Sequence, residues 1–246
     1  MYEDILQSKT HRTSLLPSGP WLMTQKWEHL LFAHYEVNPQ VLKPHLPPGL
    51  ELDTYDGRAW MTVIPFRVSG MRLRGTLHIP YLHTYLELNV RTYVKKNGLS
   101  GIYFFSLDAD KLPAVLGARV LTLPYFSATM AMSEKAGAYR FISERKHGRN
   151  AVIDCKYKPT GESYFPKKDS LASWLLERYW LWTYKRGVLF KGGIHHKQWD
   201  VYHTSADISG GNLFPFAPAP DISSSVLLHY AAARRVLFWK VKKEKQ

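Results

Sequence analysis

The residues with the clearest potential for chemistry lie between positions 85 and 93. Polar and apolar side chains alternate through this segment, so a strand here carries Glu87 and Arg91 on one face. A buried glutamate accepts and returns a proton when its pKa is raised, and an arginine binds a carboxylate through its fork of donors. Glu87 and Arg91 are therefore candidates for a shared polar site.

The sequence leaves open which way this strand face points. Large aromatic residues alternate there with Glu, Asn and Arg, a combination typical of a strand that lines the wet interior of a closed sheet. A solvent-exposed face with one Glu–Arg pair gives the same alternation, because the pattern does not reveal which face is buried.

Other residue types with catalytic potential lack a supporting motif. Cys155, the only cysteine, is interpreted as a bystander thiol, because a nucleophile needs a histidine partner. His195 and His196 are adjacent on a predicted strand and point to opposite faces, and the usual zinc-ligand spacing is missing. We therefore expect no metal, and we take His196 as a candidate pocket-lining residue. No phosphate loop, dinucleotide fingerprint or Gly-x-Ser-x-Gly elbow is present, so no cofactor is expected.

Strands must supply most of the framework that positions these residues. Alternating segments separated by tight-turn sequences predict antiparallel hairpins, with turns at 56–57, 96–98 and 135–137. A few short helices are expected, together with one longer helix from Leu171 to about Lys185, capped by Asp169 or Ser170. The predicted fold class is α+β, with a predominantly antiparallel sheet.

The domain organisation is expected to be simple. Residues 1–20 are rich in Ser, Thr and Pro and are predicted to form a loosely ordered lead. From Trp21 the pattern of strands begins, and no linker or repeat divides residues 21–246. A length of 246 residues fits one large domain or two small ones, and the unbroken pattern after Trp21 favours one.

The chain is strongly basic, with a formal net charge of +13. Its basic residues fall in small scattered groups without a nucleic-acid-binding motif, so we interpret them as a solvated surface and expect no specific nucleic-acid partner. No apolar run reaches the length of a membrane span, and the acidic N-terminus lacks a secretory pattern. With a single cysteine, this predicts a cytoplasmic protein. The oligomeric state is left open, homo-oligomers included.

Three segments together resemble the YqjF-like family of uncharacterised bacterial proteins. The resemblance covers most of the chain after Trp21, and its motifs are specific for the family rather than for a function. The segments are Val37-Asn38-Pro39 with Leu46-Pro47-Pro48-Gly49-Leu50-Glu51, the strand from Tyr85 to Val94, and Tyr103 to Ala109 with Ala118-Arg119 and Leu123-Pro124-Tyr125.

That family is in turn similar, more distantly, to acetoacetate decarboxylase. The resemblance implies a cone-like or double-barrel β-fold around a central pocket, and a lysine that forms a Schiff base. Tyr85-x-Glu87 matches the relative's strand, and Arg119 stands for its arginine. Tyr125 and Phe126 occupy its two lysine positions, and neither supplies an amine. The Pro-Lys-Lys sequence at 166–168 lies far from the expected place, in a loop that we expect to be exposed.

These observations lead to one main hypothesis and two alternatives. The protein is predicted to bind or transform a small compound with a carbonyl or carboxylate group, without Schiff-base chemistry. Glu87 and Tyr125 are the catalytic candidates, because one can take a proton and the other can donate to a carbonyl oxygen. The alternatives are a ligand-binding or sensor protein without catalysis, and a basic surface that binds nucleic acid or anionic membrane. Whether the protein is an enzyme stays open. The predicted ligand contacts are Glu87, Arg91, Arg119, Tyr125 and His196.

Overall fold

Strands make up 58% of the residues that the computed structural model describes, which are 2–76, 84–111, 123–224 and 227–244. The helices of this part of the chain are α1 (Glu3–Gln7), α2 (Pro39–Leu42), the 3-10 helix η1 (Lys43–His45) and α4 (Leu171–Leu176). The strands are β1 (Met23–Val37), β2 (Glu51–Leu52), β3 (Ala59–Leu73), β4 (Thr84–Lys96), β5 (Leu99–Ala109), β6 (Tyr125–Lys135), β7 (Ala138–Arg145), β8 (Val152–Tyr164), β9 (Trp180–Lys185), β10 (Val188–His195), β11 (Val201–Gly211), β12 (Leu227–Phe238) and β13 (Lys242–Lys243).

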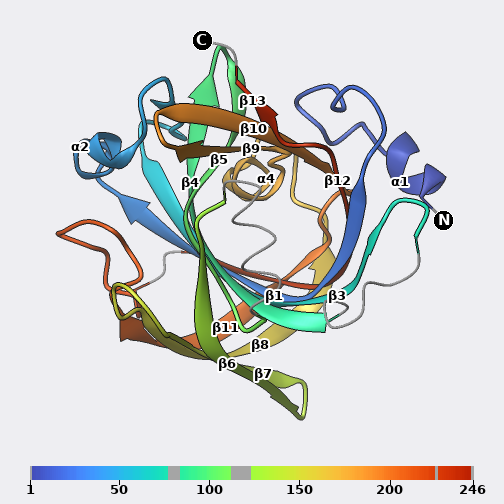
Figure 1. The fold of residues 1–246 in the computed structure, drawn as a ribbon. Coiled ribbons are helices and arrows are strands. Elements are labelled where there is room, and N and C mark those ends of the chain that lie inside the picture. The colour runs from blue at the N-terminus through green and yellow to red at the C-terminus, as the bar shows by residue number, and fades with distance from the viewer. Residues whose placement is uncertain (1, 77–83, 112–122, 225–226, 245–246) are drawn as a thin grey trace.

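The strands form one sheet that closes on itself. Pairing runs β5-β6-β7-β8-β11-β12-β1-β3-β4 and returns to β5, a ring of nine strands. A second closure joins β10 to β12, so that β9 and β10 bridge between β5 and β12. Figure 1 shows the strands surrounding a central space in which α4 lies. Neighbouring strands are antiparallel except that β5 pairs in parallel with β6 and with β9.

Short turns with left-handed backbone set the hairpin registers. Asn97 and Gly98 join β4 to β5 with φ values of 50° and 75°, and Arg186 and Gly187 join β9 to β10 with 51° and 79°. Two consecutive residues of positive φ twist the chain as the strands of a hairpin require. The turn predicted at residues 96–98 is therefore confirmed, and it fixes the register that places the polar residues of β4.

The wall formed by β1, β3 and β4 separates two hydrophobic cores. One core holds residues of α4, β5 and the β9–β10 hairpin, and it takes Phe32, Phe66 and Tyr93 from the wall. The other core holds residues of β7, β8 and β11, and it takes Leu31, Val63 and Val90. Because each strand of the wall sends alternate side chains to the two cores, both of its faces are buried. This answers the question that alternation alone left open for β4.

Helix α4 begins where the sequence predicts and ends much earlier. The Ser170 hydroxyl accepts a hydrogen bond from Ser173 N at 3.2 Å, as expected of a helix cap. The helix stops at Leu176, whereas the sequence predicted helix to about Lys185. Residues 180–185 instead form β9 and pair with β10 and β5. Aromatic and β-branched residues favour a strand once partner strands are in place, and sequence periodicity alone does not reveal that partner.

Several residues of the N-terminal lead contact the domain. The lead contains α1, and Ile5 packs in a small core with Trp21, Leu237 and Trp239. Arg12 donates to the Ile194 carbonyl at 3.0 Å and lies 4.1 Å from the centre of the Tyr179 ring. The polar composition of the lead predicts loose order and does not reveal these few contacts.

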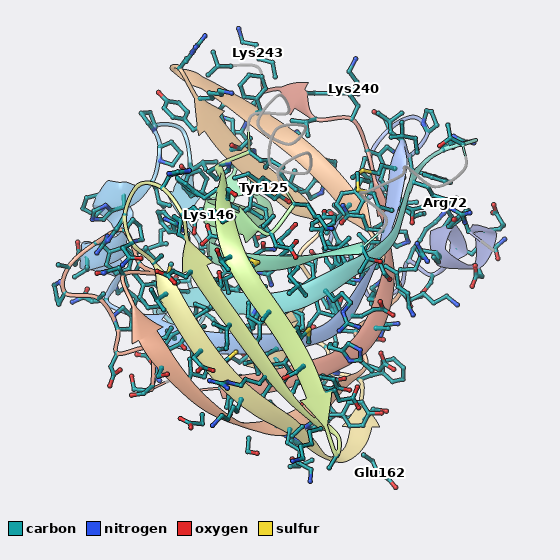
Figure 2. The ribbon with its side chains drawn as sticks, turned by 60° about the horizontal axis from the view of Figure 1, so that its bottom comes forward. Arg72, Tyr125, Lys146, Glu162, Lys240 and Lys243 are labelled. Carbon is teal, nitrogen blue, oxygen red and sulfur yellow. The ribbon has the colours of Figure 1, made fainter. Side chains whose placement is uncertain are left out.

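The positive charges lie on separate sides of the molecule. In Figure 2, Lys240 and Lys243 project at one end and Arg72 lies at another edge, while Tyr125 lies within the outline of the sheet. Among the described residues, no helix has both the length and the apolar character needed to cross a membrane.

Candidate functional site

A buried carboxyl group and a phenol meet inside the closed sheet. Glu87 comes from β4 and Tyr125 is the first residue of β6, and the Tyr125 hydroxyl donates to Glu87 Oε2 at 2.8 Å. Strand β5 lies between β4 and β6 and holds the two residues at this separation, with Leu107 opposite Tyr125. Their side chains share the core that contains α4, so the interior interpretation of this strand face is the one the structure supports.

Further hydrogen bonds fix the orientation of Glu87. The side chains of Tyr85 and Asn89 also bond to its carboxylate. Tyr85 in turn accepts from Gln25 Nε2 at 3.1 Å, and Trp27 Nε1 donates to Gln25 Oε1 at 2.9 Å. This chain of contacts from β1 to β4 leaves the carboxyl group little rotational freedom, which is the condition for a well-placed acid or base.

Burial tunes the pKa of Glu87 toward neutrality. Removal from water raises it from 4.5 to about 7, while the hydrogen bonds from Tyr125, Asn89 and Tyr85 oppose the rise. Burial and the neighbouring Glu87 raise the pKa of Tyr125 well above its ordinary value, so Tyr125 remains a proton donor. A carboxyl group with a pKa near 7 exchanges protons efficiently in either direction at physiological pH.

Arg91 lies on the same face of β4 as Glu87, but the two form no ion pair within the described structure. The Arg91 Nη2 atom donates to the Leu175 carbonyl at 3.3 Å, at the end of α4. Two buried atoms here, Asn89 Oδ1 and Arg91 Nε, have no hydrogen-bond partner among the described residues. Buried polar atoms normally have partners, so these two atoms are exceptions within the described interior.

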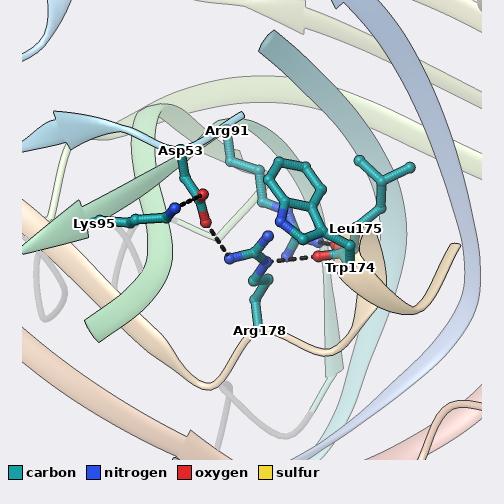
Figure 3. Close-up of polar contacts among 6 residues, drawn as sticks. All are labelled: Asp53, Arg91, Lys95, Trp174, Leu175 and Arg178. Atoms are coloured by element: carbon teal, nitrogen blue, oxygen red, sulfur yellow. Dashed lines mark hydrogen bonds and ion pairs between the residues drawn. The ribbon is translucent and has the colours of Figure 1, made fainter. Parts of the chain in front are cut away.

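A second arginine, which the sequence did not single out, lies beside Arg91. Arg178 donates to Asp53 Oδ2 at 2.7 Å, and Asp53 also contacts Lys95 Nζ at 2.8 Å (Figure 3). Asp53 and Arg178 are both buried. One feature of the sequence could have indicated Arg178. The adjacent charged residues Glu177 and Arg178 interrupt an otherwise apolar and aromatic stretch.

His196 belongs to a different cluster from the Glu87–Tyr125 pair. It is buried between Tyr179 and Trp199, with ring-centre distances of 4.8 and 4.9 Å, and its Nδ1 donates to the Lys197 carbonyl at 2.7 Å. Burial holds its pKa well below the ordinary value, so the ring is neutral. In the same cluster Glu177 accepts from the Tyr179 hydroxyl and from Trp199 N.

The remaining sequence candidates have simpler outcomes. Arg119 lies outside the described residues. Cys155 is buried, and burial raises the pKa of its thiol to about 12, which keeps it protonated. Lys167 and Lys168 are exposed in the loop after β8, as predicted. Within the described ranges, no three His, Cys, Asp or Glu side chains are grouped to hold a metal ion.

Buried amines are missing from the interior as far as it is described. None of the lysines in the described ranges is buried. Outside those ranges the sequence has one lysine, Lys245. A Schiff-base amine is held in a desolvated place that keeps it neutral, and no lysine among the described residues lies in such a place.

A sheet closed around a central helix, with a polar pair inside, defines the class of the protein as acetoacetate decarboxylase-like in fold. The enduracididine biosynthesis enzyme MppR, complexed with the condensation product of pyruvate and imidazole 4-carboxaldehyde, superposes with a TM-score of 0.66 at 14% identity, covering 94% of this chain and 92% of that one. Acetoacetate decarboxylase from Legionella pneumophila gives 0.61 at 17% identity, with 99% and 95% covered. At these identities the likeness establishes the fold alone.

The sequence gives the family. The model of the DUF2071 family, described as an uncharacterized conserved protein, matches residues 24–235. The uncharacterized protein YqjF of Bacillus subtilis (strain 168) is 42% identical over 229 residues, which cover 93% of this chain and 95% of YqjF. The chain belongs to the DUF2071 family, and the family resemblance found in its motifs is confirmed.

Proposed function

We propose that the protein binds a small compound with a carbonyl or carboxylate group and transfers a proton at the carbon next to the carbonyl. The observation that carries this proposal is the buried Tyr125–Glu87 hydrogen bond of 2.8 Å, with a Glu87 pKa of about 7. The MppR structure gives secondary support, because that protein is complexed with a product of pyruvate condensation in a related fold.

Each residue has a defined role in the proposed reaction. The ionised Glu87 takes a proton from the carbon, and the electron pair of the C–H bond moves to form the enolate. Tyr125 turns its hydroxyl from Glu87 to the carbonyl oxygen and stabilises the negative charge that develops there. When the proton on Glu87 is first replaced by one from solvent, its return to the same carbon completes an exchange, and delivery of the proton to another atom of the enolate completes an isomerisation. No step requires an amine, in agreement with the lack of a buried lysine in the described interior.

Proton exchange tests this proposal directly. The wild-type protein is incubated in D2O with pyruvate, acetoacetate and acetone, and loss of the C–H signal is followed by proton NMR. We expect Glu87→Gln to lower the exchange rate at least ~100-fold, the usual contribution of a general base. Glu177→Gln is the matched control, because Glu177 is also a buried carboxyl group with a raised pKa but lies outside the pair.

Two results would contradict the proposed chemistry. Exchange that survives in Glu87→Gln would show that Glu87 is not the base. A stable adduct on any lysine after borohydride treatment with the same compounds would show Schiff-base chemistry. Saturable binding without exchange across the panel would identify the protein as a non-catalytic binder.

A further inference from the structure

The space at the end of α4 holds an excess of buried positive charge. Arg91 and Arg178 are both at least nine-tenths buried, and among the described residues the one buried carboxylate in contact with the pair is Asp53, which binds Arg178. Lys95 also contacts Asp53, but its side chain is 42% exposed, so water solvates its charge. Segments 77–83, 112–122 and 225–226 contain no Asp or Glu, so no further acid is hidden there. An uncompensated buried charge is costly, which calls for an anionic partner.

The two guanidinium groups also keep unused donors. Arg178 donates from Nη1 to Asp53 and from Nε to the Trp174 carbonyl at 2.6 Å. Its buried Nη2 has no partner in the described structure. Among the described residues, Arg91 makes one hydrogen bond, to the Leu175 carbonyl, and its buried Nε makes none. A guanidinium has five N–H donors, and carbonyl oxygens satisfy only some of them here without neutralising the charge.

Aromatic rings hold both arginines in one place. The Tyr93 ring centre is 5.8 Å from Arg91 Cζ and 5.2 Å from Arg178 Cζ, and Arg178 also stacks on Trp174 at 4.1 Å. Figure 3 shows the two arginine side chains reaching toward Trp174 from opposite sides. Such stacking restricts each guanidinium and prepares it for an incoming acceptor.

We infer that Arg91 and Arg178 form an oxyanion site that binds the carboxylate of a small aliphatic acid. This inference rests on the proposed function and names its substrate class. The arginine site belongs with the proposed base because Glu87 and Asn89 lie on the same face of β4 as Arg91. The carboxylate binds at the arginines while the carbon that exchanges its proton faces Glu87. Asp53 contacts Arg178 and Lys95 contacts Asp53, so these two act as positioning residues and do not touch the ligand.

Calorimetric titration tests the site separately from the chemistry. The probes are acetate, pyruvate, acetoacetate and the neutral ester methyl pyruvate. We expect the wild type to bind the acids and not the ester, and Arg91→Gln to weaken binding of the acids at least tenfold. Arg178→Lys keeps a cation beside Asp53 and loses the fork of donors, so a smaller loss is expected.

Matched controls separate this site from general damage. Arg145→Gln breaks an equally buried arginine–aspartate pair, with Asp108 at 2.9 Å and a ring stacked at 4.1 Å, and we expect it to bind the acids as the wild type does. Glu87→Gln should also retain acid binding, because it removes only the base.

The possible outcomes are distinct. Equal binding of pyruvate and its methyl ester, or wild-type affinity in Arg91→Gln, would overturn the oxyanion site. If Arg91→Gln does not fold, the comparison of acid and ester on the wild type still decides. Proton exchange on acetone without any acid binding would overturn this site and leave the proposed function standing. Acid binding lost with Arg91 but without any proton exchange would support the site and overturn the proposed chemistry.

Discussion

A carboxyl group as deeply buried as that of Glu87 couples its protonation to folding. Its pKa is about 7 in the folded protein and 4.5 in the absence of burial. The unfolded chain therefore releases this proton at a lower pH than the folded protein does. The stabilising contribution of neutral Glu87 is complete below about pH 4.5 and is lost as the pH rises through 7.

Glu87→Gln should remove this pH dependence. The free energy of unfolding of the wild type relative to the variant should fall by about 3 kcal/mol between pH 4.5 and 7.5, since each pKa unit corresponds to ~1.4 kcal/mol. Urea unfolding at a series of pH values measures it. Buried histidines such as His34 act in the opposite direction and cancel, because they are common to both proteins. A difference that does not change with pH would show that the pKa of Glu87 is not raised.

At the scale of elements, the junction of β5 and β9 holds the hairpin against the ring. Gly101 lies where β5 passes β9, and a Cβ added there would meet the Trp180 carbonyl oxygen at 2.3 Å and the Trp182 ring at 2.5 Å. The close approach of these two strands therefore depends on glycine at position 101, which has no side chain. Through β9, the same junction fixes the chain that follows α4.

Gly101→Ala should destabilise the protein by about 2–3 kcal/mol, because backbone and ring must shift to admit a methyl group. Gly211→Ala is the control, since a Cβ at this position of β11 meets no atom within 4 Å. Thermal unfolding followed by circular dichroism compares them. Similar melting temperatures for the two variants would mean that the strands do not approach so closely.

At the scale of the whole molecule, the N-terminal lead contacts the end of β10, where Arg12 donates to the Ile194 carbonyl and the His195 ring bonds to the Ile5 carbonyl. Ile5 is 6% exposed and Leu15 is 89% exposed, so the lead combines anchored and free positions. The net charge of +13 is spread over separate sides of this assembly, as Lys240, Lys243 and Arg72 illustrate (Figure 2).

Ile5→Ser should lower the free energy of unfolding by about 2 kcal/mol, the value of a buried aliphatic side chain. Leu15→Ser should change it by less than about 0.5 kcal/mol, because the side chain is already in water. Chemical denaturation measures both. If neither substitution has an effect, the lead is as loosely ordered as its composition suggests.

The fold class and the polar face of β4 could be read from local patterns, because strand alternation and turn residues are properties of short segments. Glu87, Arg91 and Tyr125 were identified in this way, the last with the help of family motifs. Arg178 and Asp53 could not be identified, because their meeting depends on where α4 ends and on how the sheet closes.

The sequence by itself determined a strand-rich chain of the DUF2071 family. Only the tertiary structure decided that both faces of β4 are buried, since that requires one wall to serve two cores. It also decided that Glu87 accepts a hydrogen bond from Tyr125 and does not pair with Arg91 in the described structure. The physical reason is long-range strand pairing. It buries Glu87, which raises the pKa of that carboxyl group, and it brings Arg91 and Arg178 close together.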